Sequence, residues 1–151
     1  MQIRAALAID LPTVYAGELD YIREIEPQQE DRWRAGMLHH LRQWTENLDR
    51  MFVAQSSDKA VGYCFWEARD RTAVLASIYV SSDRRREGLG KTLLETFLAD
   101  AHAKGCTKIT LGVKAENPAR RLYEASGFAY SHDEGGYRHY LFSSGGVRDE
   151  P

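Results

Sequence analysis

The sequence is poor in cysteine and in long hydrophobic runs. Its two cysteines, Cys64 and Cys106, are too few for the disulfide framework of a small secreted domain. No hydrophobic run approaches the roughly 20 residues that a transmembrane helix requires, and residues 1–7 lack the long apolar core of a signal peptide. We therefore expect a cytoplasmic protein that has no membrane partner.

The sequence also lacks an excess of charge of one sign and a recognisable metal-binding motif. Its Lys and Arg residues number 20 against 22 Asp and Glu residues, and the formal net charge is −2. This balance argues against a general nucleic-acid binder and predicts no nucleic-acid partner. The histidines His39, His40, His102 and His132 show no spacing typical of metal ligands, so we predict no metal.

Linkers rich in proline or glycine and internal repeats are absent as well. A chain of 151 residues is long enough for one domain with a hydrophobic core. We expect a single domain over residues 1–142. The polar tail, residues 143–151, is expected to be disordered.

Hydrophobic periodicity predicts strands and helices along the rest of the chain. Strands are expected at residues 2–7, 51–55, 60–68, 73–80, 108–113, 128–132 and 137–142, and helices at residues 10–25, 30–48, 88–104 and 118–126. This order favours an α/β sandwich. The expected sheet is mixed, mostly antiparallel and about seven-stranded, with four helices covering both faces.

The most informative segment is the basic, glycine-containing run 84–91, Arg-Arg-Arg-Glu-Gly-Leu-Gly-Lys. It lies between an apolar strand and an amphipathic helix. The first N–H groups of a helix have no partner within the helix and carry partial positive charge. Gly88 and Gly90 let a phosphate approach the backbone, and Arg85 and Arg86 add full positive charge. This segment therefore predicts a site for a ligand that carries a pyrophosphate.

Two familiar phosphate-binding motifs fit this segment poorly. A Walker loop requires G-x-x-x-x-G-K-[ST], whereas the glycines here bracket a single residue, and a dinucleotide G-x-G-x-x-G would require glycine in place of Leu93. The segment instead reads R-x-x-G-x-G, with Arg85, Gly88 and Gly90. This pattern resembles the acyl-CoA pyrophosphate loop of the GNAT superfamily of N-acetyltransferases.

A second segment strengthens the resemblance. Residues 117–128, Asn-Pro-Ala-Arg-Arg-Leu-Tyr-Glu-Ala-Ser-Gly-Phe, are similar to the superfamily pattern N-x-x-A/R-x-x-L-Y-x-x-x-G-F. Asn117 and Pro118 suit the start of a helix, and Gly127 suits its end. From the order and spacing of the two motifs, residues 59–142 are identified as GNAT-like.

The resemblance implies a fold in which the central strand and the next strand splay apart and admit the pantetheine arm of acetyl-CoA. Relatives bind this arm through the backbone of the central strand and through the motif asparagine, and they bind the pyrophosphate through the loop. The acetyl-CoA-binding residues expected on this basis are Ile78, Tyr79, Val80, Arg85, Arg86, Glu87, Gly88, Leu89, Gly90, Lys91, Asn117 and Tyr123.

The resemblance also implies a general acid, but it does not identify the general base. Tyr123 matches the motif tyrosine that lies near the CoA sulfur in relatives, so we expect it to be the general acid for the leaving thiolate. Some relatives carry an acid or a histidine where this chain has Val74 and Ala76, and protein N-terminal acetylases often carry an acid in place of Gly112. The nearest candidate base is Glu67, at the end of the preceding strand, and a water relay through backbone carbonyls is the alternative.

The implied function is direct transfer of an acetyl group from acetyl-CoA to a primary amine in a ternary complex. We expect a small cationic amine, an amino-acid derivative or a protein amine as acceptor, because acidic residues in the first two helices would attract a cation. These residues are Glu18, Asp20, Glu24, Glu26, Glu30 and Asp31. The alternatives are a non-catalytic module that binds or senses acyl-CoA and an unrelated binder of nucleotide phosphates. Relatives commonly dimerise, so a homodimer is a possible assembly.

Overall fold

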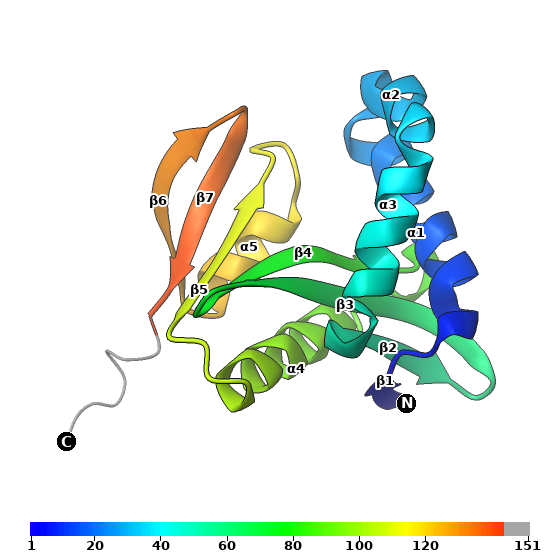
Figure 1. Cartoon of the computed structure of the whole chain (residues 1–151), viewed down its shortest axis with the longest axis horizontal. Helices are drawn as coiled ribbons and strands as arrows, with labels where there is room; N and C mark the ends of the chain where they lie inside the picture. The colour runs from blue at the N-terminus through cyan, green and yellow to red at the C-terminus, as the bar shows by residue number, and fades with distance from the viewer. Residues whose placement is uncertain (144–151) are drawn as a thin grey trace.

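The computed structural model describes residues 1–143, and the predicted tail from residue 144 onwards lies outside the described residues. A seven-stranded sheet runs through the molecule in the order β1-β2-β3-β4-β5-β7-β6 (Figure 1). The strands are β1 (Gln2–Ala5), β2 (Met51–Ser56), β3 (Lys59–Arg69), β4 (Thr72–Val80), β5 (Lys108–Val113), β6 (Phe128–Glu134) and β7 (Tyr137–Phe142). The α-helices are α1 (Leu11–Ile25), α2 (Glu30–Ala35), α3 (Met37–Glu46), α4 (Leu89–Ala103) and α5 (Ala119–Ala125).

The predicted mixed, mostly antiparallel sheet is confirmed. Within residues 1–143, β4 and β5 form the only parallel pair, and every other neighbouring pair of strands is antiparallel. A parallel pair requires a long crossover connection, and α4 supplies it between β4 and β5.

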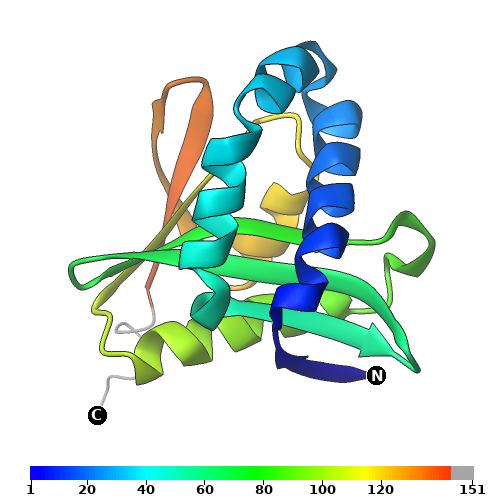
Figure 2. The same cartoon turned by 45° about the vertical axis from the view of Figure 1, so that its right-hand side comes forward.

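Helices cover both faces of the sheet and enclose a separate hydrophobic cluster on each. On one face, α1 and α3 cross the sheet with α2 beyond its edge (Figure 2), and the cluster beneath them contains Val14, Trp44, Tyr63 and Phe65. On the other face, α4 and α5 pack over a larger cluster that includes Trp66. From Tyr63 to Trp66 the side chains of β3 alternate between the two clusters, as strand geometry requires.

The second predicted helix, residues 30–48, is divided in the structure, so the described chain has five α-helices where four were expected. The division falls at Gly36, which ends α2 with backbone φ −92° and ψ 17°. Glycine has the weakest helix propensity after proline. The His40 ring bonds the Trp33 carbonyl oxygen at 3.0 Å, which holds the two helices together across the break.

The parallel strands β4 and β5 separate at the predicted ligand site. Pairing between β4 and β5 runs from Thr72↔Lys108 to Leu75↔Leu111 and stops there, although β4 continues to Val80. On its other side, β4 pairs with β3. Phe65 pairs with Ser77, and the next residue, Trp66, pairs with Leu75. Ala76 therefore has no partner on β3 and forms a β-bulge. The bulge reverses the alternation, and Ser77 therefore faces α1.

An ion pair ties β1 to the start of α1. The Arg4 guanidinium donates two hydrogen bonds of 2.8 Å to the Asp10 carboxylate, and the Leu7 N–H donates a third of 2.7 Å. Hydrogen bonding from Arg4 is the main reason why the pKa of Asp10 is lowered in the folded protein. Such a group stabilises the fold above its unfolded pKa, and the contribution is lost as the pH falls through the folded pKa.

Replacing Asp10 by asparagine is therefore expected to lower the free energy of unfolding at neutral pH by about 2 kcal/mol. The difference from the wild type should be smaller at about pH 2 than at neutral pH, because the stabilising charge is lost as the pH falls through the folded pKa of Asp10. Urea denaturation at the two pH values measures this. Asp58→Asn, in the exposed turn between β2 and β3, is the control. An equal deficit of Asp10→Asn at both pH values would contradict the explanation.

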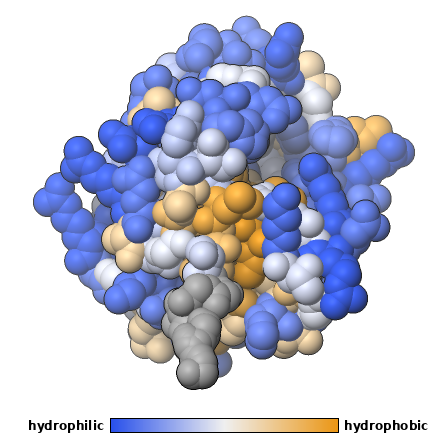
Figure 3. Space-filling model, turned by 90° about the vertical axis from the view of Figure 1, so that its left-hand side faces the viewer, coloured by the Kyte–Doolittle hydropathy of each residue, from blue (hydrophilic) through white to orange (hydrophobic). Residues whose placement is uncertain are grey.

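None of the helices in residues 1–143 combines the length and the hydrophobicity that a bilayer-spanning segment requires. Cys64 and Cys106 are both free, and Cys64 is buried. The face on the β6–β7 side is mainly hydrophilic, with hydrophobic residues gathered in its centre (Figure 3). The homodimer remains a prediction.

Candidate active site at the splayed strands

The loop before α4 presents unpaired backbone N–H groups. Arg86 and Gly88 have positive φ values of 68° and 85°, and Gly88 is the residue that immediately precedes the helix. No side chain caps the N-terminus of α4, so its first N–H groups are free to bind a ligand. Backbone N–H groups gathered by such a turn form an anion-binding concavity, and the helix dipole strengthens it.

Arg85 joins this loop to α1. Its Nε donates to the Val80 carbonyl oxygen at 2.9 Å, and its Nη1 pairs with the Glu24 carboxylate at 3.0 Å. The guanidinium carbon also lies 5.8 Å from the centre of the Tyr79 ring. Arg85 is thus oriented by the backbone of β4, and Glu24 pairs with one of its terminal nitrogens.

A cavity of about 410 Å³, here called the loop cavity, opens beside these groups. Its volume is within the range of small-molecule sites. Residues of the predicted phosphate loop and of the end of β4 line it together with the start of α5. The predicted ligand-binding residues among its lining are Ile78, Tyr79, Val80, Arg85, Arg86, Gly88, Leu89, Gly90 and Asn117.

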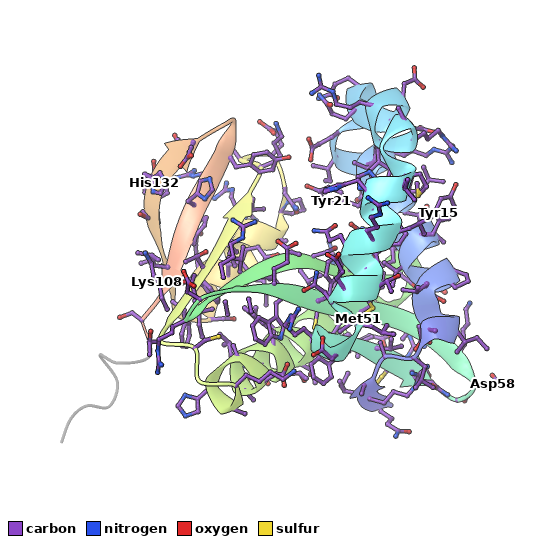
Figure 4. All side chains as sticks on the ribbon, viewed as in Figure 1. Tyr15, Tyr21, Met51, Asp58, Lys108 and His132 are labelled. Carbon is purple, nitrogen blue, oxygen red and sulfur yellow. The ribbon has the colours of Figure 1, made fainter. Side chains whose placement is uncertain are left out.

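A second cavity of about 260 Å³, here called the helix cavity, lies between α1–α3 and the splayed strands. The two cavities share Tyr21, Ile78 and Asn117 in their linings, so they meet at the gap between β4 and β5. Tyr21 projects from α1 towards this gap (Figure 4). Two ligands that enter from opposite sides can therefore meet at one point.

Tyr123 of α5 lines the helix cavity. Its side chain is buried and packs edge-on against Phe128, and its hydroxyl makes no hydrogen bond to any described residue. Burial raises the pKa of Tyr123 above its ordinary value, so the phenol remains protonated at neutral pH. The side chain can therefore donate a hydrogen bond or a proton into the cavity.

Two carboxylates also line the helix cavity. Glu26 accepts hydrogen bonds from Tyr21 at 3.2 Å and from Tyr137 at 3.3 Å, and it lies 3.9 Å from the Lys114 ammonium. Glu18 accepts hydrogen bonds from the Tyr63 and Ser77 hydroxyls at 2.5 and 2.6 Å. The charge of Glu26 is thus balanced by a cation of the protein, whereas Glu18 has hydroxyl partners alone among the described residues.

Three of the predicted site residues lie outside both cavities. Glu67, the candidate base, accepts hydrogen bonds from Gln43 and Arg69 and contributes to neither lining. Glu87 forms an ion pair with Arg84, and Lys91 is exposed on α4. Glu18 was anticipated only as one of several acidic residues of the first helices, because no local pattern marks the approach of its side chain to Tyr63 and Ser77.

The sheet also assembles a polar cluster that the histidine spacing did not predict. His132 and His139 are cross-strand partners on β6 and β7, and with Glu134 they bring three ligand-type atoms within 4.8 Å of one another. Their ring nitrogens already contact Glu134, His132 at its carboxylate and His139 at its carbonyl oxygen. His139 covers Gly112, where any Cβ would approach the imidazole within 3.1 Å.

The fold and the site together define a class of protein: an α/β protein with an uncapped helix N-terminus beside a gap between two parallel strands, an arrangement suited to a phosphate-bearing ligand. The sequence pattern described as the acetyltransferase (GNAT) family matches residues 19–128. The chain belongs to this family.

Individual relatives agree with this assignment. The sequence is 27% identical to human N-acetyltransferase 8 over 56% of this chain and 49% of that protein, so the match spans about half the length of that relative. The fold is similar to the PaiA N-acetyltransferase of Thermoplasma acidophilum in complex with coenzyme A, with a TM-score of 0.78, 21% identity, and 93% and 97% of the two chains covered. A ribosomal-protein-alanine N-acetyltransferase from Brucella melitensis has a TM-score of 0.68, 22% identity, and coverage of 93% and 97%.

Proposed function

We propose that the protein transfers an acetyl group from acetyl-CoA directly to a primary amine. One observation carries the proposal: the loop cavity, with its uncapped helix N-terminus, meets the helix cavity at Ile78 and Asn117. A pyrophosphate-bearing acyl donor and an amine can therefore approach from opposite sides without a covalent protein intermediate. Membership of the GNAT family supports the same chemistry.

The residues of the loop cavity suit the donor. The first N–H groups of α4 and the Arg85 guanidinium would bind the pyrophosphate. The free backbone edge of β4 beyond Leu75, no longer paired with β5, would bind the amide groups of the pantetheine arm. These contacts would deliver the thioester to the gap where the cavities meet.

Tyr123 suits the role of general acid for the departing sulfur. Burial raises the pKa of the Cys64 thiol to about 12, and Cys64 is close enough to influence Tyr123 electrostatically. A thiolate that forms in the same buried region would be strongly basic for the same reason. It would therefore accept a proton or a hydrogen bond from the phenol, and this would stabilise the leaving group.

Acetyl-CoA binding is expected to raise the melting temperature of the protein by several degrees. A ligand that binds only the folded state, at 100 times its dissociation constant, adds about 2.7 kcal/mol to the free energy of unfolding. Thermal melts with acetyl-CoA measure this, and ATP and NAD are the controls. A larger shift with ATP than with acetyl-CoA would contradict the proposal and favour a nucleotide-phosphate binder.

A turnover assay distinguishes an enzyme from a non-catalytic module that only binds acyl-CoA. Thiol release from acetyl-CoA should accelerate with spermidine, tyramine, lysine amide or a peptide that begins with alanine. The helix cavity, lined by two carboxylates and by aromatic residues such as Trp33 and Tyr137, suits a cationic amine. A clear thermal shift without thiol release for any amine would favour a non-catalytic acyl-CoA-binding module.

A further inference from the structure

We propose that Glu18 is the general base that removes a proton from the acceptor's ammonium group, an inference that rests on the proposed acetyl transfer. Glu18 lies on α1, away from the central-strand and β5 positions where relatives carry an acid. In this chain those positions hold Val74, Ala76 and Gly112.

The two oxygens of the Glu18 carboxylate have different environments. Oε2 accepts both hydrogen bonds, from Tyr63 and from Ser77, and Oε1 has no hydrogen-bond partner among the described residues. The side chain lines the helix cavity. The hydroxyl pair therefore anchors one oxygen and leaves the other available to an amine in the cavity.

Two features of the backbone build this arrangement. Gly17, next to Glu18 on α1, allows the Tyr63 ring to lie against the helix, because a Cβ there would come within 2.6 Å of the ring and hydroxyl. The bulge at Ala76 turns Ser77 towards α1. A strand without the bulge would direct the Ser77 hydroxyl to the opposite face of the sheet.

Burial shifts the pKa of the Glu18 carboxyl in the direction that favours proton transfer. It raises the pKa of Glu18 above its ordinary value, and the hydrogen bonds from Ser77 and Tyr63 lower it in part. A base whose pKa is shifted towards neutrality is more effective than an ordinary exposed carboxylate. A buried carboxylate without a protein cation beside it also attracts the cationic form of an amine.

The groups that face Glu18 allow this role. Tyr63 bonds Glu18 directly and Tyr79 stacks on the Tyr63 ring; both have raised pKa values and are neutral at pH 7. Across the helix cavity lie Glu26 from the end of α1, His40 from α3, Tyr123 from α5 and Tyr137 from β7. Burial lowers the pKa of His40, so this ring is neutral at pH 7 and adds no positive charge. Lys114 is paired with Glu26.

The proton and electron balance is complete without another reactant. Glu18 takes one proton from the ammonium, and the neutral amine nitrogen attacks the thioester carbon as the C–N bond forms. The C–S bond then breaks, and the thiolate receives the phenolic proton of Tyr123. The amide nitrogen returns a proton to the Tyr123 phenolate. The proton on Glu18 leaves to water once the acetylated amine has left.

Glu18→Gln tests the proposal, with Glu95→Gln on the exposed surface of α4 as the matched control. We expect Glu18→Gln to retain the acetyl-CoA melt shift and to lose about 10²-fold or more in kcat/KM for the fastest amine of the panel. The deficit should shrink as the pH approaches the pKa of the amine, about 10, because the free amine then needs no base. A rate within about threefold of the wild type, with an unchanged pH profile, would overturn the proposal.

Glu67→Gln tests the alternative that Glu67 is the general base. A loss of rate in Glu67→Gln that alkaline pH rescues, with normal turnover by Glu18→Gln, would transfer the role to Glu67, the carboxylate that the sequence suggested. Replacing Glu18 should not weaken the fold, because a carboxyl with a raised folded pKa destabilises the folded state at neutral pH. Urea denaturation should show Glu18→Gln to be as stable as the wild type or more so.

One measurement is independent of turnover and of the acceptor's identity. A carbon-13 NMR titration of the CoA-bound protein, with Glu18→Gln used to assign the signal, reports the pKa of the Glu18 carboxyl directly. A pKa above the ordinary value of about 4.3 supports the inference even where no amine of the panel reacts, and a pKa at or below it overturns the inference. Absence of turnover with a raised pKa would count against the proposed function alone.

Discussion

Replacing Tyr123 by phenylalanine is expected to lower kcat for thiol release by about 10²- to 10³-fold while leaving the acetyl-CoA melt shift unchanged. The change removes one hydroxyl from a residue that lines the helix cavity, and this hydroxyl has no hydrogen-bond partner among the described residues. The ring would keep its contact with Phe128, 6.1 Å between centroids. A loss in kcat with retained binding is the signature of an interaction made in the transition state.

Tyr130→Phe is the matched control, because Tyr130 is about half exposed on the edge strand β6. Its kinetics should match those of the wild type. Unchanged turnover in Tyr123→Phe would show that Tyr123 is not the general acid, and would indicate water as the proton donor to the thiolate.

Replacing Arg85 by alanine is expected to weaken acetyl-CoA binding by about ten- to a hundredfold. A hydrogen bond to a charged group contributes about 1.5–3 kcal/mol, and each 1.4 kcal/mol corresponds to a factor of ten in affinity. Isothermal titration calorimetry measures the change. Arg71→Ala, in the exposed turn between β3 and β4, removes the same charge far from the loop and should bind normally.

Glu24→Gln is expected to act in the opposite direction. The Glu24 carboxylate pairs with Arg85 at 3.0 Å and therefore competes with a pyrophosphate for the same guanidinium. Its neutral isostere should tighten acetyl-CoA binding a few-fold, most clearly at low ionic strength. Equal affinities for the wild type, Arg85→Ala and Glu24→Gln would contradict the assignment of the loop to the pyrophosphate.

The phosphate loop was predictable because its signals are local. Gly88 adopts the positive φ that its residue type allows, and α4 begins at Leu89, one residue after the predicted start. The same holds for α5, where the Asn117 side chain bonds the Ala119 N–H at 2.9 Å. Such features depend on residues a few positions apart, so the sequence carries them without knowledge of the fold.

The second helix shows the limit of periodicity. The hydrophobic stripe from Trp33 to Trp44 continues across Gly36, and a periodic pattern alone cannot distinguish one long helix from two consecutive ones. The backbone breaks at the glycine because the residue contributes no side chain to packing and has little preference for the helical conformation.

What the sequence by itself determined is the set of local structures: seven strands, a helix that begins after a glycine loop, a basic residue beside that loop, and a tyrosine on α5. What only the tertiary structure decided is which acidic residues line the helix cavity and what their oxygens contact. The Oε2 atom of Glu18 meets Tyr63, 45 residues away, and Ser77, 59 residues away. A single extra residue at Ala76 decides which face Ser77 occupies, because side chains alternate along a strand and one insertion reverses every later position.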